Sequence, residues 1–335
     1  MPKQYVTLVL EIRKWSYRII HRFLAPNLRS VIARKNVTGS ARRRDSFCIL
    51  RAQVRKLLLR KGILKSMLIR LGYDIQFDTL GEVPIVTLLN VHPSRKKDLR
   101  EPDELHTDPA VKIENYKDSF GNHGCRLVAP PGKIRFQNST LIEDSGKPDL
   151  EGPSAREIPI EQLPLGVLPY LMNSRYCEVD LLSNTASELF WNTPRGWQRV
   201  QAVCDWVHSK VTFGYEFSHP TRTALGVYTE RVGVCRDFQH LAITFCRALN
   251  IPARYATGYL GDIGVIVEPS PMDFSAWFEV YLEDRWWTFD ARHNIRRIGR
   301  VLMATGRDAT DCAITTSFGR AKLINFQVTS DEVKD

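Results

Sequence analysis

The feature that most constrains the fold is a cysteine at the start of a predicted helix, followed by three β-rich segments. After Cys235, apolar residues recur at helical spacing to about Leu249, and residues 250–252 (Asn-Ile-Pro) end the pattern. Residues 254–259 read as a strand. Residues 275–282 and 285–290 are two further β-rich runs that are separated by only two polar residues. This spacing predicts a hairpin with its turn at residues 283–284.

The position of Cys235 suggests a nucleophile. A thiol at a helix start faces unpaired backbone N–H groups and the positive end of the helix dipole. We expect both to favour the thiolate, which is the reactive form of a catalytic cysteine. The alternative is a small buried residue with only a packing role.

The basic residues are concentrated in the first fifth of the chain. Residues 1–66 contain 17 Lys and Arg against only Glu11 and Asp45, whereas the rest contains 30 against 35 acidic residues. A basic amphipathic stretch from Phe47 to Leu71 could contact an anionic membrane or nucleic acid. The segment also resembles an organellar transit peptide, being rich in Arg and poor in acids. We interpret residues 1–66 instead as an N-terminal extension that packs on no other part of the chain.

Size and cysteine usage bound the class of protein. A chain of 335 residues with 43% hydrophobic content can bury a sizeable core and suits two domains. Its seven cysteines show no paired short-loop spacing and no CxxC, which argues against a disulfide framework or a structural zinc site and predicts a cytoplasmic protein. No apolar run approaches the roughly 20 residues of a membrane span. No metal or organic cofactor is expected.

The remaining pattern predicts two domains joined by a linker. Residues 67–142 contain short β-prone runs broken by Gly, Pro and Asn, and are predicted to form a β-rich domain whose three histidines are solvated. Residues 143–166 are rich in Pro, Glu, Asp and Ser and read as a linker. Residues 167–335 make the second domain, in which residues 198–211 are an amphipathic helix. Cys204 and His208 could ligate a metal from that helix, but a packed helix face explains them better.

Four ordered motifs resemble the bacterial transglutaminase-like superfamily of papain-like thiol enzymes. They are Arg231-Val232-Gly233-Val234-Cys235-Arg236-Asp237-Phe238, Arg247-Ala248-Leu249-Asn250-Ile251-Pro252-Ala253-Arg254-Tyr255, Ala276-Trp277-Phe278-Glu279-Val280-Tyr281 and Trp287-Thr288-Phe289-Asp290. The resemblance implies an α+β fold in which the helix bearing the cysteine packs on an antiparallel sheet. The β-rich domain is similar to one that accompanies bacterial members.

The resemblance also implies a Cys–His–Asp triad, with Cys235 as nucleophile and Asp290 as the acid that orients the imidazole. The family's histidine usually precedes the Ala-Trp of the first hairpin strand. In this chain that position is Ser275. A serine hydroxyl is not a useful general base near neutral pH, so another group would have to accept the proton.

His293 is the leading substitute base. In the expected hairpin register Trp277 lies opposite Asp290, and Ser275 is diagonal to Asp290 at about 7–8 Å. His293 would fall on the opposite face if the strand continued, so a bend at residues 291–292 is required. The other histidines considered as the base are His208, His219 and His240. We expect Asp237 to stabilise the first turn of the helix.

Oxyanion and substrate groups are less constrained. The N–H of Cys235 is the expected first oxyanion donor, and Tyr215, in the β-like run of residues 211–217, is a candidate for the second. Trp277, Trp286 and Trp287 could line an acyl-binding cleft or belong to the core.

Two functions follow from these residues. The first is a peptidase, amidase or acyltransferase that acts on peptide or protein amides through a Cys235 thioester. The alternative is a catalytically impaired module that binds peptides or proteins, because Ser275 stands at the usual histidine position.

Overall fold

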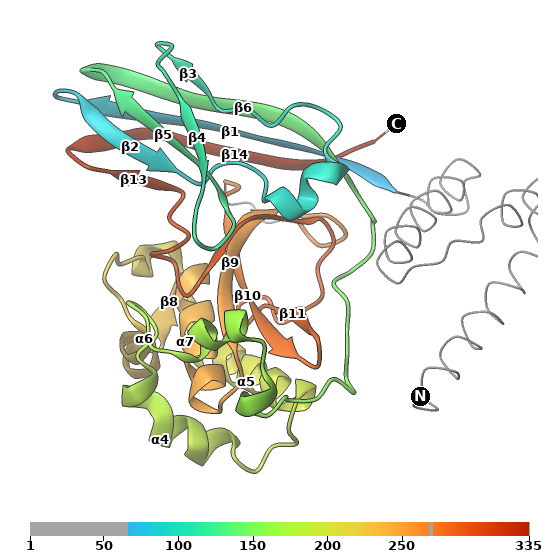
Figure 1. The fold of residues 1–335 in the computed structure, drawn as a ribbon. Coiled ribbons are helices and arrows are strands. Elements are labelled where there is room, and N and C mark those ends of the chain that lie inside the picture. The colour runs from blue at the N-terminus through green and yellow to red at the C-terminus, as the bar shows by residue number, and fades with distance from the viewer. Residues whose placement is uncertain (1–65, 268–270, 335) are drawn as a thin grey trace, which may run out of the picture. The chain divides into compact units, whose positions relative to one another are not determined.

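The computed structural model describes residues 66–267 and 271–334, which form one compact unit (Figure 1). Three four-stranded antiparallel sheets carry most of the strands, and the short β7 and β8 form a separate parallel pair. The strands and α-helices of this unit are β1 (Met67–Thr79), β2 (Val83–Thr87), β3 (His106–Asp108), β4 (Glu114–Lys117), β5 (His123–Ala129), β6 (Gly132–Asp144), α4 (Val179–Phe190), α5 (Trp197–Lys210), β7 (Thr212–Phe213), α6 (Ala224–Glu230), β8 (Val232–Gly233), α7 (Cys235–Ala248), β9 (Ala253–Leu260), β10 (Ser275–Leu282), β11 (Arg285–Phe289), β12 (Arg300–Gly306), β13 (Thr315–Ser317) and β14 (Ala321–Val333). The predicted α+β class is confirmed.

The β-rich part consists of two sheets that share one core. Their strand orders are β14-β1-β6-β3 and β13-β2-β5-β4. Along β1, alternate residues from Ile69 to Phe77 are buried and pack on Ile85, Leu127 and Phe136. This period of two is the pattern of a strand with one face in the core.

The predicted division into residues 67–142 and 167–335 separates strands that pair in the structure. Strand β14 pairs with β1 along its length, from Leu68↔Val333 to Thr79↔Ala321, and β13 pairs with β2. The β-rich part therefore includes residues 315–333, which the sequence had placed in the second domain. β1 has a neighbour on each edge, β6 and β14, and the second of these comes from the far end of the chain.

The third sheet, β11-β10-β9-β12, lies between the helices and the β-rich part (Figure 1). Helix α7 packs on one face of this sheet, where Phe238 and Phe245 meet Phe278 in a common core. Tyr259 and Val301 pack into the core of the β-rich part. Helices α4, α5 and α6 surround α7, so that most of α7 is buried.

The segment expected as a linker is fixed to the second part of the chain. Asp149 accepts from the N–H of Arg297 at 3.0 Å, and its own N–H donates to the Arg297 carbonyl at 2.9 Å. Ala155 accepts from the N–H of Trp197 at 3.0 Å. Residues 143–166 thus carry structural contacts that their composition did not suggest.

Several local predictions are confirmed. Helix α7 begins at Cys235 and ends at Ala248, and the following Asn250 has a left-handed φ of 63°. The hairpin has the expected register, with Leu282 paired to Arg285. The turn residue Glu283 has a φ of 57°, a left-handed conformation that the Glu-Asp pair did not signal.

Other local predictions were wrong or lie outside the described residues. Residues 67–71 belong to strand β1, so the basic amphipathic pattern cannot continue as a helix to Leu71. The proposed roles of residues 1–65 lie outside the described part of the chain. Of the three histidines expected to be solvated, His106 is exposed, whereas His92 and His123 are half-buried and hydrogen-bonded. No helix among the described residues is long and apolar enough to cross a membrane.

Candidate active site

Cys235 is the first residue of α7 and stands where the helix meets the third sheet. The chain enters the helix through a turn that Asp237 closes, because its carboxylate accepts from the N–H of Val234 at 2.9 Å. This contact agrees with the expected role of Asp237 in the first helical turn. Of the described cysteines, only Cys235 is half-buried and the other five are buried.

The helix start lowers the pKa of the Cys235 thiol as expected, but burial outweighs it. Burial, together with the nearby Asp273 carboxyl, raises the pKa of the Cys235 thiol to about 11. Arg292 and the N–H groups of Arg236 and Ala276, which donate to the sulfur, act in the opposite direction. Desolvation of the charged form thus outweighs the helix terminus, and the resting cysteine is a neutral thiol.

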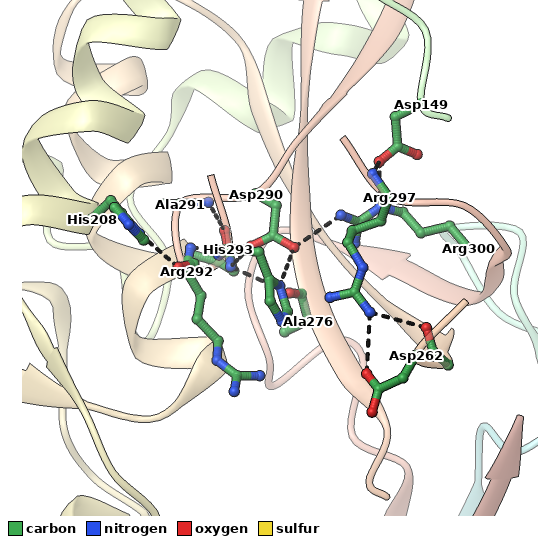
Figure 2. A network of polar contacts seen from close by, with 12 residues as sticks. Asp149, His208, Asp262, Ala276, Asp290, Ala291, Arg292, His293, Arg297 and Arg300 are labelled. Atoms are coloured by element: carbon green, nitrogen blue, oxygen red, sulfur yellow. Dashed lines mark hydrogen bonds and ion pairs between the residues drawn. The ribbon is translucent and has the colours of Figure 1, made fainter. Parts of the chain in front are cut away.

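Asp290 follows β11, and both of its carboxylate oxygens accept hydrogen bonds (Figure 2). Its Oδ1 accepts from the N–H groups of Arg292 and His293 at 3.0 and 3.1 Å, and from Nε2 of Gln239 at 3.1 Å. Its Oδ2 accepts from Nδ1 of His293 and from Nη2 of Arg300, both at 2.9 Å. The carboxylate therefore organises the turn that follows it.

Arg300 holds Asp290 in its ionised form. Burial alone would raise the pKa of the Asp290 carboxyl, but the Arg300 guanidinium and the His293 imidazole together lower it well below its usual range. The Arg300 side chain is 7% exposed, and its Nε donates to Asp149 at 3.0 Å. Arg300 is thus shared between two carboxylates, as Figure 2 shows.

The bend required for His293 is present. The N–H of Asn294 donates to the carbonyl of Asp290 at 2.9 Å, which closes a turn over residues 290–294. His208 on α5 donates from Nδ1 to the carbonyl of Arg292 at 2.7 Å and anchors the same turn. In a neutral His293 that donates from Nδ1 to Asp290, the lone pair lies on Nε2.

A cavity of about 200 Å³ connects these groups. Cys235, Ser275 and His293 all line it, together with Tyr215 and Arg297. Ser275 is the first residue of β10, directly before Ala276, whose N–H contacts the sulfur. The structure thus brings the predicted nucleophile Cys235, the predicted substitute base His293 and Ser275 to one cavity.

Gln239 is a site residue that sequence reasoning missed. It is fully buried one turn after Cys235, and its Nε2 donates to the carbonyl of Ala276 at 3.2 Å as well as to Asp290. Its Oε1 accepts from the N–H of Ala291 at 3.1 Å. One amide side chain therefore ties the cysteine helix to both strands of the hairpin. An uncharged polar residue four positions after the cysteine was the available signal, because residues i and i+4 share a helix face.

Of the predicted oxyanion and substrate residues, Tyr215 lines the cavity and the tryptophans do not. Tyr215 lines the cavity, but it sits in a 3-10 turn and is 46% exposed, so the expected strand was too long. Trp277 is 2% exposed beneath the Arg300 guanidinium and does not line the cavity. Trp286 and Trp287 pack on Tyr170 and Trp197 away from it. Among the described residues, no group of three or more His, Cys, Asp or Glu side chains is arranged to hold a metal.

Two further histidines are held by other contacts. His240 is fully buried, is stacked on Tyr176 and accepts from the N–H of Ala309 at 3.2 Å, and burial lowers its pKa to about 3. The Nδ1 of His219 contacts the Thr221 hydroxyl at 3.1 Å. Neither histidine lines the cavity that contains Cys235.

Comparisons with known proteins agree with this architecture. Residues 184–291 match the family described as the transglutaminase-like superfamily. A crystal structure from Cytophaga hutchinsonii, described as a candidate cysteine protease, is 29% identical and covers 81% of this chain and 92% of its own, with a TM-score of 0.72. An uncharacterized protein of Mycobacterium leprae is 24% identical over 223 residues, which are 63% of this chain and 77% of that protein.

Proposed function

We propose that the chain cleaves or transfers peptide or isopeptide amides through a Cys235 thioester, with His293 as the base; the match of residues 184–291 to the transglutaminase-like superfamily supports this proposal. The fold supports thiol-dependent chemistry in general. The observation that carries the finer proposal is the contact of 2.9 Å between His293 Nδ1 and the buried Asp290 carboxylate, in a site that Cys235 also lines.

The proposed reaction begins with a neutral thiol. As the Cys235 sulfur attacks the amide carbonyl, Nε2 of His293 accepts the thiol proton, and Asp290 stabilises the resulting imidazolium. The imidazolium then protonates the amine as the C–N bond breaks, which leaves a thioester on Cys235. Water or a second amine then attacks the thioester and gives its proton to His293, and as the C–S bond breaks the imidazolium returns this proton to the Cys235 sulfur.

The raised pKa of Cys235 fits this order of events. A thiol that is neutral at rest needs a base at the moment of attack, and His293 has the tautomer for that task. The N–H of Cys235 is the proposed oxyanion donor. Tyr215 lines the same cavity and stays the candidate for the second donor.

Acyl-enzyme trapping with a casein digest tests the proposal. Mass spectrometry of the whole protein should show acyl adducts on Cys235 in the wild type, and hydroxylamine should release them. The adducts should be absent in Cys235→Ala and at least about 100-fold slower to form in His293→Ala. His219→Ala is the matched control, since that histidine does not line the cavity. Equal adduct formation in the His293 and His219 variants would exclude His293 as the base.

The alternative of an impaired binding module rests on Ser275. It predicts no adduct in the wild type and a gain of amidase activity in Ser275→His, because the histidine would return to the family position. Comparable activity in wild type and Ser275→His would instead favour a base elsewhere in the site.

A further inference from the structure

Two residues that line the cavity containing Cys235 carry buried polar atoms that the fold does not satisfy. Within residues 66–267 and 271–334, neither Oγ of Ser275 nor Nε of Arg297 has a hydrogen-bond partner. Ser275 is 8% exposed and Arg297 is 5% exposed, and both line this cavity. Because a buried donor without a partner destabilises the folded state, such groups call for an explanation, and a bound substrate would provide one.

The guanidinium of Arg297 is held in place through its Nη2 atom. Its Nη2 donates to the carbonyl of Gly261 at 3.0 Å and lies 3.4 Å from Oδ1 of Asp262 (Figure 2). These contacts fix the orientation of the side chain and leave Nε without an acceptor. An arginine stays protonated, and its planar fork of N–H groups matches the two oxygens of a carboxylate.

Ser275 places a second donor beside the reaction centre. The next residue, Ala276, donates its N–H to the Cys235 sulfur, so the serine hydroxyl starts from the backbone that borders the nucleophile. The Ser275 carbonyl is already used, since it accepts from the Thr257 hydroxyl at 2.9 Å. The side chain of Ser275 is therefore the part of this residue that is left for substrate.

We propose that Ser275 and Arg297 bind a carboxylate of the substrate next to the scissile amide. This inference rests on the proposed function, because it names the substrate class of the same site. The cavity, at about 200 Å³, is smaller than most small-molecule sites and suits one residue of a peptide. The carboxylate is either an acidic side chain beside the scissile bond or the C-terminal carboxylate of the residue that is released.

The acidic groups of the cavity are compatible with this ligand. Asp262 already faces Arg297 across the contact of 3.4 Å. Asp273 is the other acidic residue of the lining, and burial raises the pKa of its carboxyl.

Binding to the full-length Cys235→Ala protein, which cannot turn over, tests the proposal by calorimetry. Two pairs of peptides separate the two sources of the carboxylate. The first pair is N-acetyl-trialanine with a free C-terminal carboxylate or a carboxamide. The second pair is an acetylated and amidated alanine pentapeptide with a central glutamate or glutamine. In at least one of the two pairs, the peptide with the carboxylate should bind at least about tenfold more tightly than the peptide with the carboxamide.

Variants in the same background assign the preference to residues. Ser275→Ala should reduce the acid-to-amide ratio about three- to tenfold, and Arg297→Lys should reduce it because the fork is lost. Ser330→Ala is the matched control, since this hydroxyl is also buried and unpartnered within residues 66–267 and 271–334 but does not line the cavity. If Arg297→Lys fails to fold, the wild-type ratio and Ser275→Ala still decide the question.

Equal affinity for acid and amide in both pairs, no binding of any peptide at millimolar concentration, or a preference that Ser275→Ala leaves unchanged would overturn the proposal. Turnover of the same peptides by wild-type protein distinguishes the two levels of inference. Acid-selective binding without turnover would count against the proposed function alone, whereas turnover without acid selectivity would count against the carboxylate site alone.

Discussion

Replacing Arg300 by methionine should destabilise the protein by about 3 kcal/mol. The side chain is 7% exposed and serves the carboxylates of Asp290 and Asp149 at 2.9 and 3.0 Å. Removal of one partner from a buried ion pair typically costs about 3–5 kcal/mol, since the other charge stays buried. The lower end applies here because Asp290 keeps its contacts with Gln239, with the N–H groups of the turn and with His293.

Urea unfolding at pH 7 measures this loss as the difference in free energy of unfolding. The matched control is Arg296→Met, which removes a surface pair with Glu151, whose partners are 45% and 52% exposed, and a hydrogen bond from Nε to the Asp149 carbonyl at 2.7 Å. Exposed pairs contribute about 0–1 kcal/mol, so the two variants should differ clearly. A loss below about 1 kcal/mol in Arg300→Met would refute the view that Arg300 maintains the ionised carboxylate.

The ionisation of Asp290 sets how the difference in free energy of unfolding between wild type and Arg300→Met depends on pH. Its folded pKa is lower than the unfolded value, so its ionised form adds stability above the unfolded pKa of about 3.9, and this stability is lost as pH falls through the folded pKa. The difference between wild type and Arg300→Met should therefore be constant above about pH 5 and shrink in more acidic solution. A difference that grows below pH 4 would contradict this assignment.

Three further predictions concern the same site. Asp290→Asn should lower kcat by about 10³–10⁴-fold in a peptidase assay, because the amide no longer fixes the imidazole tautomer; a loss under tenfold would contradict the role of Asp290. Gln239→Leu should destabilise the protein by about 1–3 kcal/mol in urea and lower kcat more than it changes KM, since buried donors and acceptors lose their partner; unchanged kcat would count against a positioning role. Iodoacetamide labelling of Cys235 should continue to accelerate from pH 7 to pH 10, because the thiol pKa is about 11; a plateau below pH 7 would indicate a preformed thiolate.

The elements that the sequence predicted well are those with local signals. Helix α7 has an apolar face at helical spacing and a clear end at residues 250–252, and the hairpin has a two-residue turn that sets its register. Strand β14 was missed because its partner β1 is about 250 residues away, and no local pattern reveals that pairing.

The residues of the candidate site also differ in whether a local sequence signal marks them. Cys235 and Asp290 could be located because motifs of residues near in sequence mark both positions. His293 required a bend that depends on backbone contacts with Asp290 and on His208 from another helix. Arg300 gave no local signal, and the pKa of Cys235 was misjudged because the helix start is local whereas burial depends on the whole fold.

The most direct test of the central claim is the turnover of His293→Ala against His219→Ala, measured as kcat on one peptide substrate with the stability of both proteins checked. The account predicts that His293→Ala loses about 10²–10⁴-fold in kcat while remaining folded, and that His219→Ala retains wild-type kcat. Wild-type kcat in a folded His293→Ala protein would show that another group accepts the Cys235 proton.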